Sequence, residues 1–146
     1  MRRETGQPRA AERLAGVNQL HRAVEWYALV TLAVVGLSHL LRPRDWVDVY
    51  ARLHRLGNPG ALINGALALV PGAAFVAAHP VWTGPGTVLT LFGWALVLKG
   101  ALCLVAPAAG LRSMARAGVG NGRKFVAGGA VALALAGFVG YVLWVS

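Results

Sequence analysis

The chain has 146 residues, of which 57% are apolar and only 13% are charged. Because soluble domains contain about 25% charged residues, this composition excludes an ordinary water-soluble fold and favours a membrane protein. The net charge of +9 does not indicate a nucleic-acid partner, since the basic residues flank apolar segments and can meet anionic lipid headgroups there.

The first predicted span follows a basic arm at residues 1–23, which we expect to be partly helical or disordered. The span itself, Val24–Leu41, is long enough to cross the membrane, because about 20 helical residues extend roughly 30 Å. The basic stretch before it is too long for a secretory signal, and no small-residue cleavage site follows. We therefore expect a membrane helix in the mature chain.

A short amphipathic helix is expected directly after the first span. Apolar residues recur there at helical spacing: Trp46, Val49, Tyr50, Leu53 and Leu56. Charged side chains, including Arg52 and Arg55, occupy the opposite face. Such a helix lies in the membrane interface with its arginines toward the headgroups.

Three further apolar segments complete a set of four spans: Ala61–His79, Gly86–Ala106 and Phe125–Val145. We therefore predict an all-α integral membrane protein with four transmembrane helices. Residues 24–82 and 83–146 would form two tandem helical hairpins within one membrane domain. The chain has one cysteine, Cys103, so it cannot form an internal disulfide.

An internal repeat supports the two-hairpin organisation. A shift of 64 residues aligns identical residues without a gap: Gly36 with Gly100, Pro43 with Pro107, Gly65 with Gly129, and Leu69 with Leu133. Because each copy holds two spans, both copies have the same orientation, as in parallel repeats related by an axis along the membrane normal. Several glycines follow Pro107, so we expect the second copy to lack a firm interfacial helix.

Small residues recur every four positions in the last span: Gly128, Ala132, Ala136 and Gly140. The equivalent strip of the second span includes Ala68 and Gly72. Such strips allow helix backbones to approach closely. We expect them at helix contacts, either within one bundle or in a homo-oligomer or another membrane-protein complex.

The basic residues also predict an orientation. Loops 42–60 and 107–124 carry arginines and a lysine and lie on one side of a four-span arrangement. The positive-inside rule places them in the cytoplasm, although the basic arm then lies on the opposite side.

Lys99 is a basic residue well inside the third span, where an ionisable group indicates a functional site. Its long stem could instead bring the ammonium group to the interface. We retain it as a lipid or ligand candidate together with Arg52, Arg55 and Arg116.

His39 and His79 are the haem-ligand candidates of the sequence. They end the first and second spans on opposite sides, so one haem could not be held by both. His79 and Trp82 fit an interfacial anchor better. We expect no cofactor, with a haem shared between His39 and another chain as the alternative.

The sequence contains no metalloprotease motif, nucleophile elbow or phosphate-binding loop, so we do not expect an enzyme. At His79-x-x-Trp82, Thr90-Leu91-x-Gly93-Trp94 and Lys99-Gly100-x6-Pro107, the chain resembles small bacterial four-helix inner-membrane proteins of uncharacterised function. The resemblance implies a bacterial inner-membrane location and a four-helix arrangement. It carries no activity or ligand.

Three functions remain open. The leading hypothesis is a non-catalytic membrane subunit or scaffold that packs against partner transmembrane helices and lipid. The alternative is a small oligomeric channel or carrier in which Lys99 and Asn64 line a path between the repeats. A haem-binding electron-transfer protein is the third hypothesis.

Overall fold

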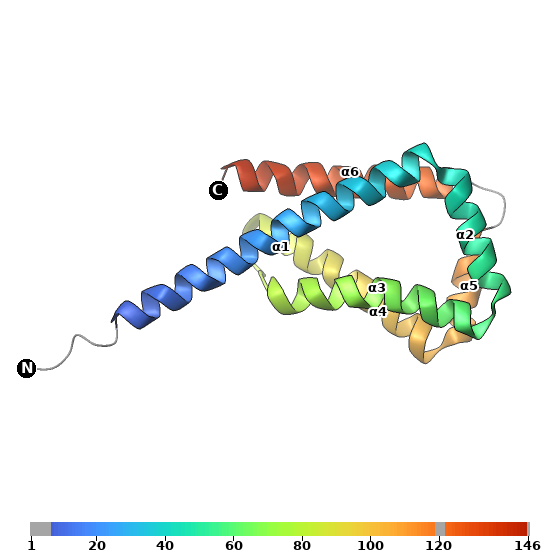
Figure 1. Ribbon diagram of the computed structural model, residues 1–146, viewed down its shortest axis with the longest axis horizontal. Helices are drawn as coiled ribbons and strands as arrows, with labels where there is room; N and C mark the ends of the chain where they lie inside the picture. The colour runs from blue at the N-terminus through green and yellow to red at the C-terminus, as the bar shows by residue number, and fades with distance from the viewer. Residues whose placement is uncertain (1–6, 119–121, 146) are drawn as a thin grey trace, which may run out of the picture.

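The computed structural model describes residues 7–118 and 122–145 (Figure 1). These residues form helices α1 (Gln7–Leu41), α2 (Pro43–Arg55), α3 (Asn58–Ala78), η1 (Gly84–Gly86), α4 (Thr87–Val105), α5 (Pro107–Gly118) and α6 (Gly122–Val145). Four of them, α1, α3, α4 and α6, are long and apolar enough to cross a membrane. The four predicted spans are therefore confirmed, and the fold is that of a multi-pass, all-α membrane protein.

The first span belongs to a longer helix. Residues 1–6 of the expected arm lie outside the described residues, and from Gln7 the chain is helical without a break to Leu41. Gly16 does not interrupt this helix, and a Cβ atom there would meet nothing within 4 Å. With 35 residues, α1 is about 50 Å long and extends past the other helices (Figure 1).

The four long helices form two close pairs. α1 packs against α6 and α3 packs against α4, whereas the consecutive spans α1 and α3 make few contacts. Figure 1 shows the pairs diverging toward one end, which α2 crosses. The 13 residues of α2 cover about 20 Å and hold α1 and α3 apart there. Each span therefore has its main packing partner in the other hairpin unit.

The two pairs repeat the same contact. A Cβ atom at Gly36 on α1 would lie 3.0 Å from the carbonyl oxygen of Gly129 on α6. A Cβ atom at Gly100 on α4 would lie 2.8 Å from the carbonyl oxygen of Gly65 on α3. The 64-residue shift converts one contact into the other, so the sequence repeat is present in three dimensions.

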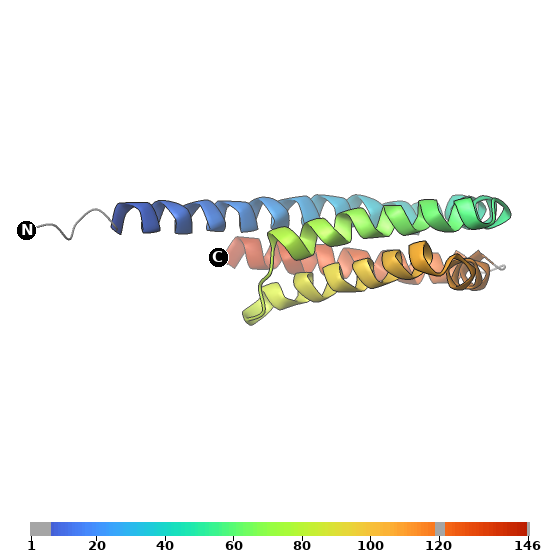
Figure 2. The ribbon, with the colours of Figure 1, turned by 90° about the horizontal axis from the view of Figure 1, so that it is seen from below.

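Two short helices cross the end where the pairs are far apart (Figures 1 and 2). The predicted helix α2 exposes its Asp and Arg residues and partly buries Trp46, Tyr50 and Leu53. α5 lies against α2, so the expectation that the second copy lacks a firm helix was wrong. Gly110 explains the error: a Cβ atom there would lie 3.1 Å from Cys103 Sγ, so this glycine permits close packing and does not loosen the helix.

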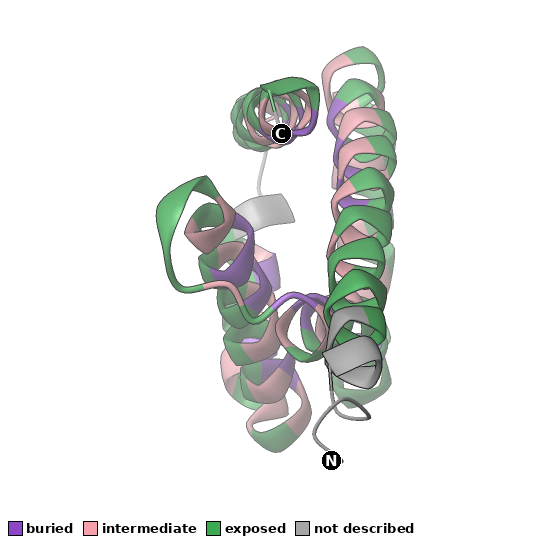
Figure 3. Cartoon of the chain, turned by 90° about the vertical axis from the view of Figure 1, so that its left-hand side faces the viewer, coloured by how far each residue is buried: buried purple, intermediate pink, exposed green. Residues whose placement is uncertain are grey.

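The apolar core lies where the two pairs meet. It is formed by buried residues of all four long helices: Ala28, Leu32, Phe75, Leu89 and Ala136. Many large apolar side chains lie outside it and are exposed, as the outer faces in Figure 3 illustrate. In a bilayer these side chains face lipid.

Candidate functional site

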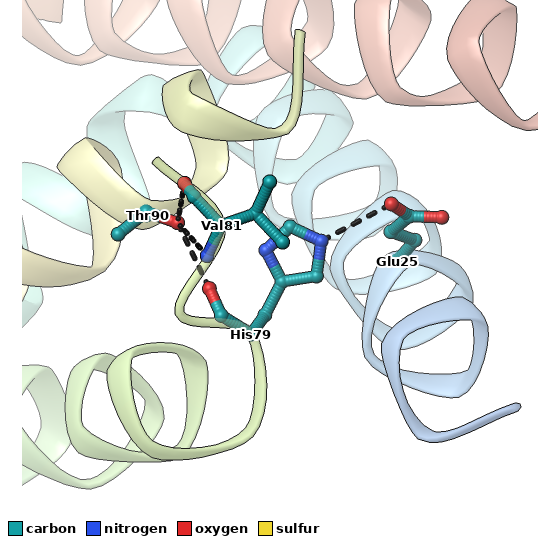
Figure 4. Close-up of polar contacts among 4 residues, drawn as sticks. All are labelled: Glu25, His79, Val81 and Thr90. Carbon is teal, nitrogen blue, oxygen red and sulfur yellow. Dashed lines mark hydrogen bonds and ion pairs between the residues drawn. The ribbon is translucent and has the colours of Figure 1, made fainter. Parts of the chain in front are cut away.

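A partly buried glutamate and a buried histidine meet at the junction of the two helix pairs (Figure 4). His79 follows the last residue of α3, and its side chain is 1% exposed; the side chain of Glu25 on α1 is 16% exposed. His79 Nε2 lies 3.1 Å from Glu25 Oε1. This contact joins a helix of one pair to a helix of the other.

Thr90 on α4 fixes the turn that carries His79 (Figure 4). Its hydroxyl oxygen accepts a hydrogen bond from the Val81 N–H at 3.2 Å and lies 2.8 Å from the carbonyl oxygens of both His79 and Val81. A hydroxyl has one hydrogen, so it donates to one carbonyl at a time. The Val81 N–H also lies 2.9 Å from the His79 carbonyl oxygen, which closes a tight three-residue turn. The imidazole is thus positioned from α4 while it contacts α1.

The second ring nitrogen of His79, Nδ1, is buried and has no hydrogen-bond partner among residues 7–118 and 122–145. Beside the ring is a small pocket whose lining is mostly apolar: Glu25, His79, Pro85, Gly86, Leu89, Phe138, Val139 and Val142. Its cavity volume is about 10 Å³, close to the space needed by one water molecule. A buried polar group without a partner costs about 1–3 kcal/mol. Stability alone therefore does not explain this arrangement.

His21 extends the polar cluster along α1. Its ring centroid lies 5.2 Å from that of His79, and it precedes Glu25 by one helical turn, so both are on the same face. Within the described part of the chain, no three His, Cys, Asp or Glu side chains are arranged to hold a metal ion.

His39 lies at the opposite end of the bundle, near α2. Its Nδ1 is 2.8 Å from the Val35 carbonyl oxygen. Its ring stacks on Trp46 with centroids 4.1 Å apart and lies near Phe125. His39 is therefore part of an aromatic packing cluster, and the structure does not bring it together with His79.

Lys99 is exposed, and its Nζ lies 3.5 Å from the hydroxyl of Tyr50 on α2. The side chain thus reaches toward the end of the bundle where Arg52, Arg55 and Arg116 are exposed. Asn64 is buried between α3 and α4, with Nδ2 3.8 Å from Cys103 Sγ. Lys99 and Asn64 therefore do not share one surface.

Most of the small-residue strips lie at contacts within the chain. Ala136 is in the core, Ala132 packs against it, and a Cβ atom at Gly140 would lie 3.4 Å from Leu29 of α1. Gly128 is exposed, and a Cβ atom there would meet nothing within 4 Å.

On α3, Ala68 and Gly72 are buried. A Cβ atom at Gly72 would lie 2.9 Å from the Gly93 carbonyl oxygen of α4. This strip therefore lies in the α3–α4 contact.

Neither Glu25 nor Thr90 is among the site residues predicted from the sequence. Glu25 lies inside the expected first span, Val24–Leu41, and an acidic residue in a span is itself a signal of function. Thr90 gave no such signal, because a single threonine in an apolar helix commonly bonds its own backbone.

Comparison with protein-family models, with curated proteins and with solved structures gives no match to the chain. The fold and the site define it as an all-α membrane protein with four membrane-length helices and a partly buried Glu–His pair.

Proposed function

We propose that the chain is a non-catalytic subunit or scaffold of the bacterial inner membrane, which packs against a transmembrane helix of another chain through the outer face of α6. The bundle's own contacts use the inner face of α6, where Phe125, Gly129 and Ala136 are buried. The outer face of α6 is exposed in the described part of the chain, so a helix of another chain can pack against it.

The observation that carries the proposal is an exposed seam of small residues on α6. Its members recur at alternating three- and four-residue spacing: Ala127, Ala130, Ala134 and Gly137. This is the spacing of a helix-packing seam, and small side chains let a second backbone approach closely in lipid. The equivalent exposed positions on α3 include the larger Ile63 and Val70. The continuous small seam of α6 therefore has no counterpart on α3, its equivalent in the repeat.

The charged residues support contact with anionic lipid and a cytoplasmic location of the basic loops. α2 and α5 cross the same end of the bundle (Figure 1), and Arg52, Arg55 and Arg116 are exposed on them. Basic residues clustered at one membrane surface favour the cytoplasmic side and its anionic headgroups. The carrier hypothesis requires Lys99 in a water-filled path, whereas its contact with Tyr50 favours a role at the lipid interface.

A pair of matched substitutions tests the α6 seam. Gly137→Leu adds a large side chain to the seam, and Ala73→Leu adds one at the repeat-equivalent exposed position of α3. We expect native mass spectrometry of gently extracted membranes to show the parent protein and Ala73→Leu bound to a second chain, and Gly137→Leu largely without it. A parent protein that is released as a single chain, or equal binding by both variants, would contradict the proposal.

A further inference from the structure

We propose that Glu25 and His79 form a proton-binding site that controls the contact between the two helix pairs. The site is built from three of the four spans: Glu25 on α1, His79 at the end of α3, and Thr90 on α4. The Glu–His contact is made between the pairs, at the end where they meet. A change in its protonation therefore acts on the junction and not on the packing within either pair.

The internal repeat indicates that the fold does not require this polar pair. The 64-residue shift places Leu89 at the position of Glu25 and Leu143 at the position of His79. Both leucines are buried, with 4% and 7% exposure. Well-packed apolar residues are often as stabilising as a buried ion pair, or more so. One copy thus has an ionisable pair where the other has leucines, which points to a function beyond packing.

The ring geometry defines what proton uptake does. When Glu25 is a carboxylate and His79 is neutral, the Nε2–H group donates to Glu25 Oε1 and Nδ1 carries no hydrogen. A proton taken from water can bind Nδ1, which gives an imidazolium, or it can bind the carboxylate. If the carboxylic acid then donates to Nε2, the ring hydrogen moves to Nδ1. The imidazolium, and the carboxylic acid that donates to Nε2, both keep the 3.1 Å contact and place an N–H group at Nδ1. A carboxylic acid protonated on its other oxygen still accepts from Nε2–H and leaves Nδ1 unchanged.

That new N–H group has no acceptor among the described residues in the closed junction, because Nδ1 is buried there without a partner. The adjoining cavity of about 10 Å³ is at the lower limit for one water molecule, and its mostly apolar lining offers such a water few of the roughly 2–4 polar partners that it needs. An unsatisfied buried donor is costly, and a charged one more so. Proton uptake therefore favours a rearrangement in which the His79 turn moves away from α1 and Nδ1 reaches water.

Besides Glu25, few ionisable groups lie near His79 in the described part of the chain. On α1, the His21 ring lies 5.2 Å from His79, and the exposed Arg22 precedes Glu25 by three residues. The pocket residues from the loop, α4 and α6 are not ionisable, and Thr90 contributes a neutral hydroxyl. Glu25 is therefore the one carboxylate among the pocket residues that a charged His79 can meet.

The experiment measures the distance between the two pairs as a function of pH. In full-length protein in lipid nanodiscs, with Cys103→Ser, spin labels are placed by Trp144→Cys on α6 and Leu91→Cys on α4, which are both exposed. We expect the label distance to be larger in mildly acidic buffer than in mildly alkaline buffer.

Two variants and one control decide the result. Glu25→Leu with His79→Leu installs the residues of the other copy, and we expect one pH-independent distance close to that of the parent at high pH. Glu25→Gln keeps a hydrogen-bond acceptor but not the carboxylate, and should reduce the response. His54→Leu, at an exposed position on α2, should retain the full response. A parent without a pH-dependent distance, or a double-leucine variant that responds as the parent does, would overturn the proposal.

Discussion

The Thr90 hydroxyl connects α4 to the turn that positions His79. Thr90→Val keeps the side-chain shape but removes the hydroxyl, so backbone groups of His79 and Val81 lose a buried partner. We expect the free energy of unfolding to fall by about 1–3 kcal/mol, which is measured as a lower Tm in detergent. Thr83→Val is the control, because Thr83 is exposed and makes no side-chain cap. Equal effects of the two substitutions would show that the hydroxyl does not hold the turn.

Single residues also show how the two copies of the repeat have diverged. His39 stacks on Trp46 in the first copy, whereas the equivalent Cys103 packs against Gly110 in the second. The large aromatic pair His39–Trp46 of the first copy is therefore replaced by the small pair Cys103–Gly110 in the second. Pattern analysis found the repeat from its identical residues, but the positions where the copies differ carry the candidate site. That site could not be read from the repeat itself.

At the scale of elements, the spans were predictable and their partners were not. Apolar length identified four helices because the hydrocarbon core sets a minimum span. Which spans pack together depends on α2, because this helix separates α1 from α3 at one end. The hydrophobic periodicity of the spans does not predict that separation. The glycines after Pro107 were misleading for a related reason: composition does not distinguish a glycine that loosens a helix from Gly110, which is buried in a contact.

Adjacent glycines of α6 provide a test of the helix contacts. Gly129→Ala would place a Cβ atom 2.8 Å from the Gly36 carbonyl oxygen, whereas at Gly128 nothing lies within 4 Å. The backbone of α1 must move to make room for the new Cβ atom of Gly129→Ala. We expect this substitution to lower the free energy of unfolding by about 1–3 kcal/mol. Gly128→Ala should be neutral or stabilising, since alanine favours helix. Thermal unfolding compares them, and similar Tm values would contradict the α1–α6 contact at this position.

At the scale of the whole molecule, the candidate site arises from the way the pairs meet. Glu25 and His79 are 54 residues apart in sequence, and each taken alone suits an interfacial position near a span end. Their contact depends on which turn of α1 lies next to the end of α3. From the sequence alone, His79 is interpreted as an interfacial anchor or a haem ligand, because no sequence pattern places Glu25 beside it.

Cross-linking tests this arrangement of pairs directly. For α1 and α6, Leu29→Cys with Gly140→Cys is made in a Cys103→Ser background, because these positions are in contact. For α3 and α4, Asn64→Cys is paired with the native Cys103, which it contacts. A short bifunctional thiol reagent should bridge both pairs within one chain, detected by mass spectrometry after digestion.

The control for these bridges is a pair on the consecutive spans α1 and α3. Val34 and Leu67 are both exposed, and cysteines at these positions in the Cys103→Ser background should not be bridged within one chain. If the control pair is bridged and Leu29–Gly140 is not, each unit forms a self-contained hairpin. In that case α1 and α3 would touch along their length. The Glu25–His79 contact would then lie inside one packed pair and could not act as a junction between two.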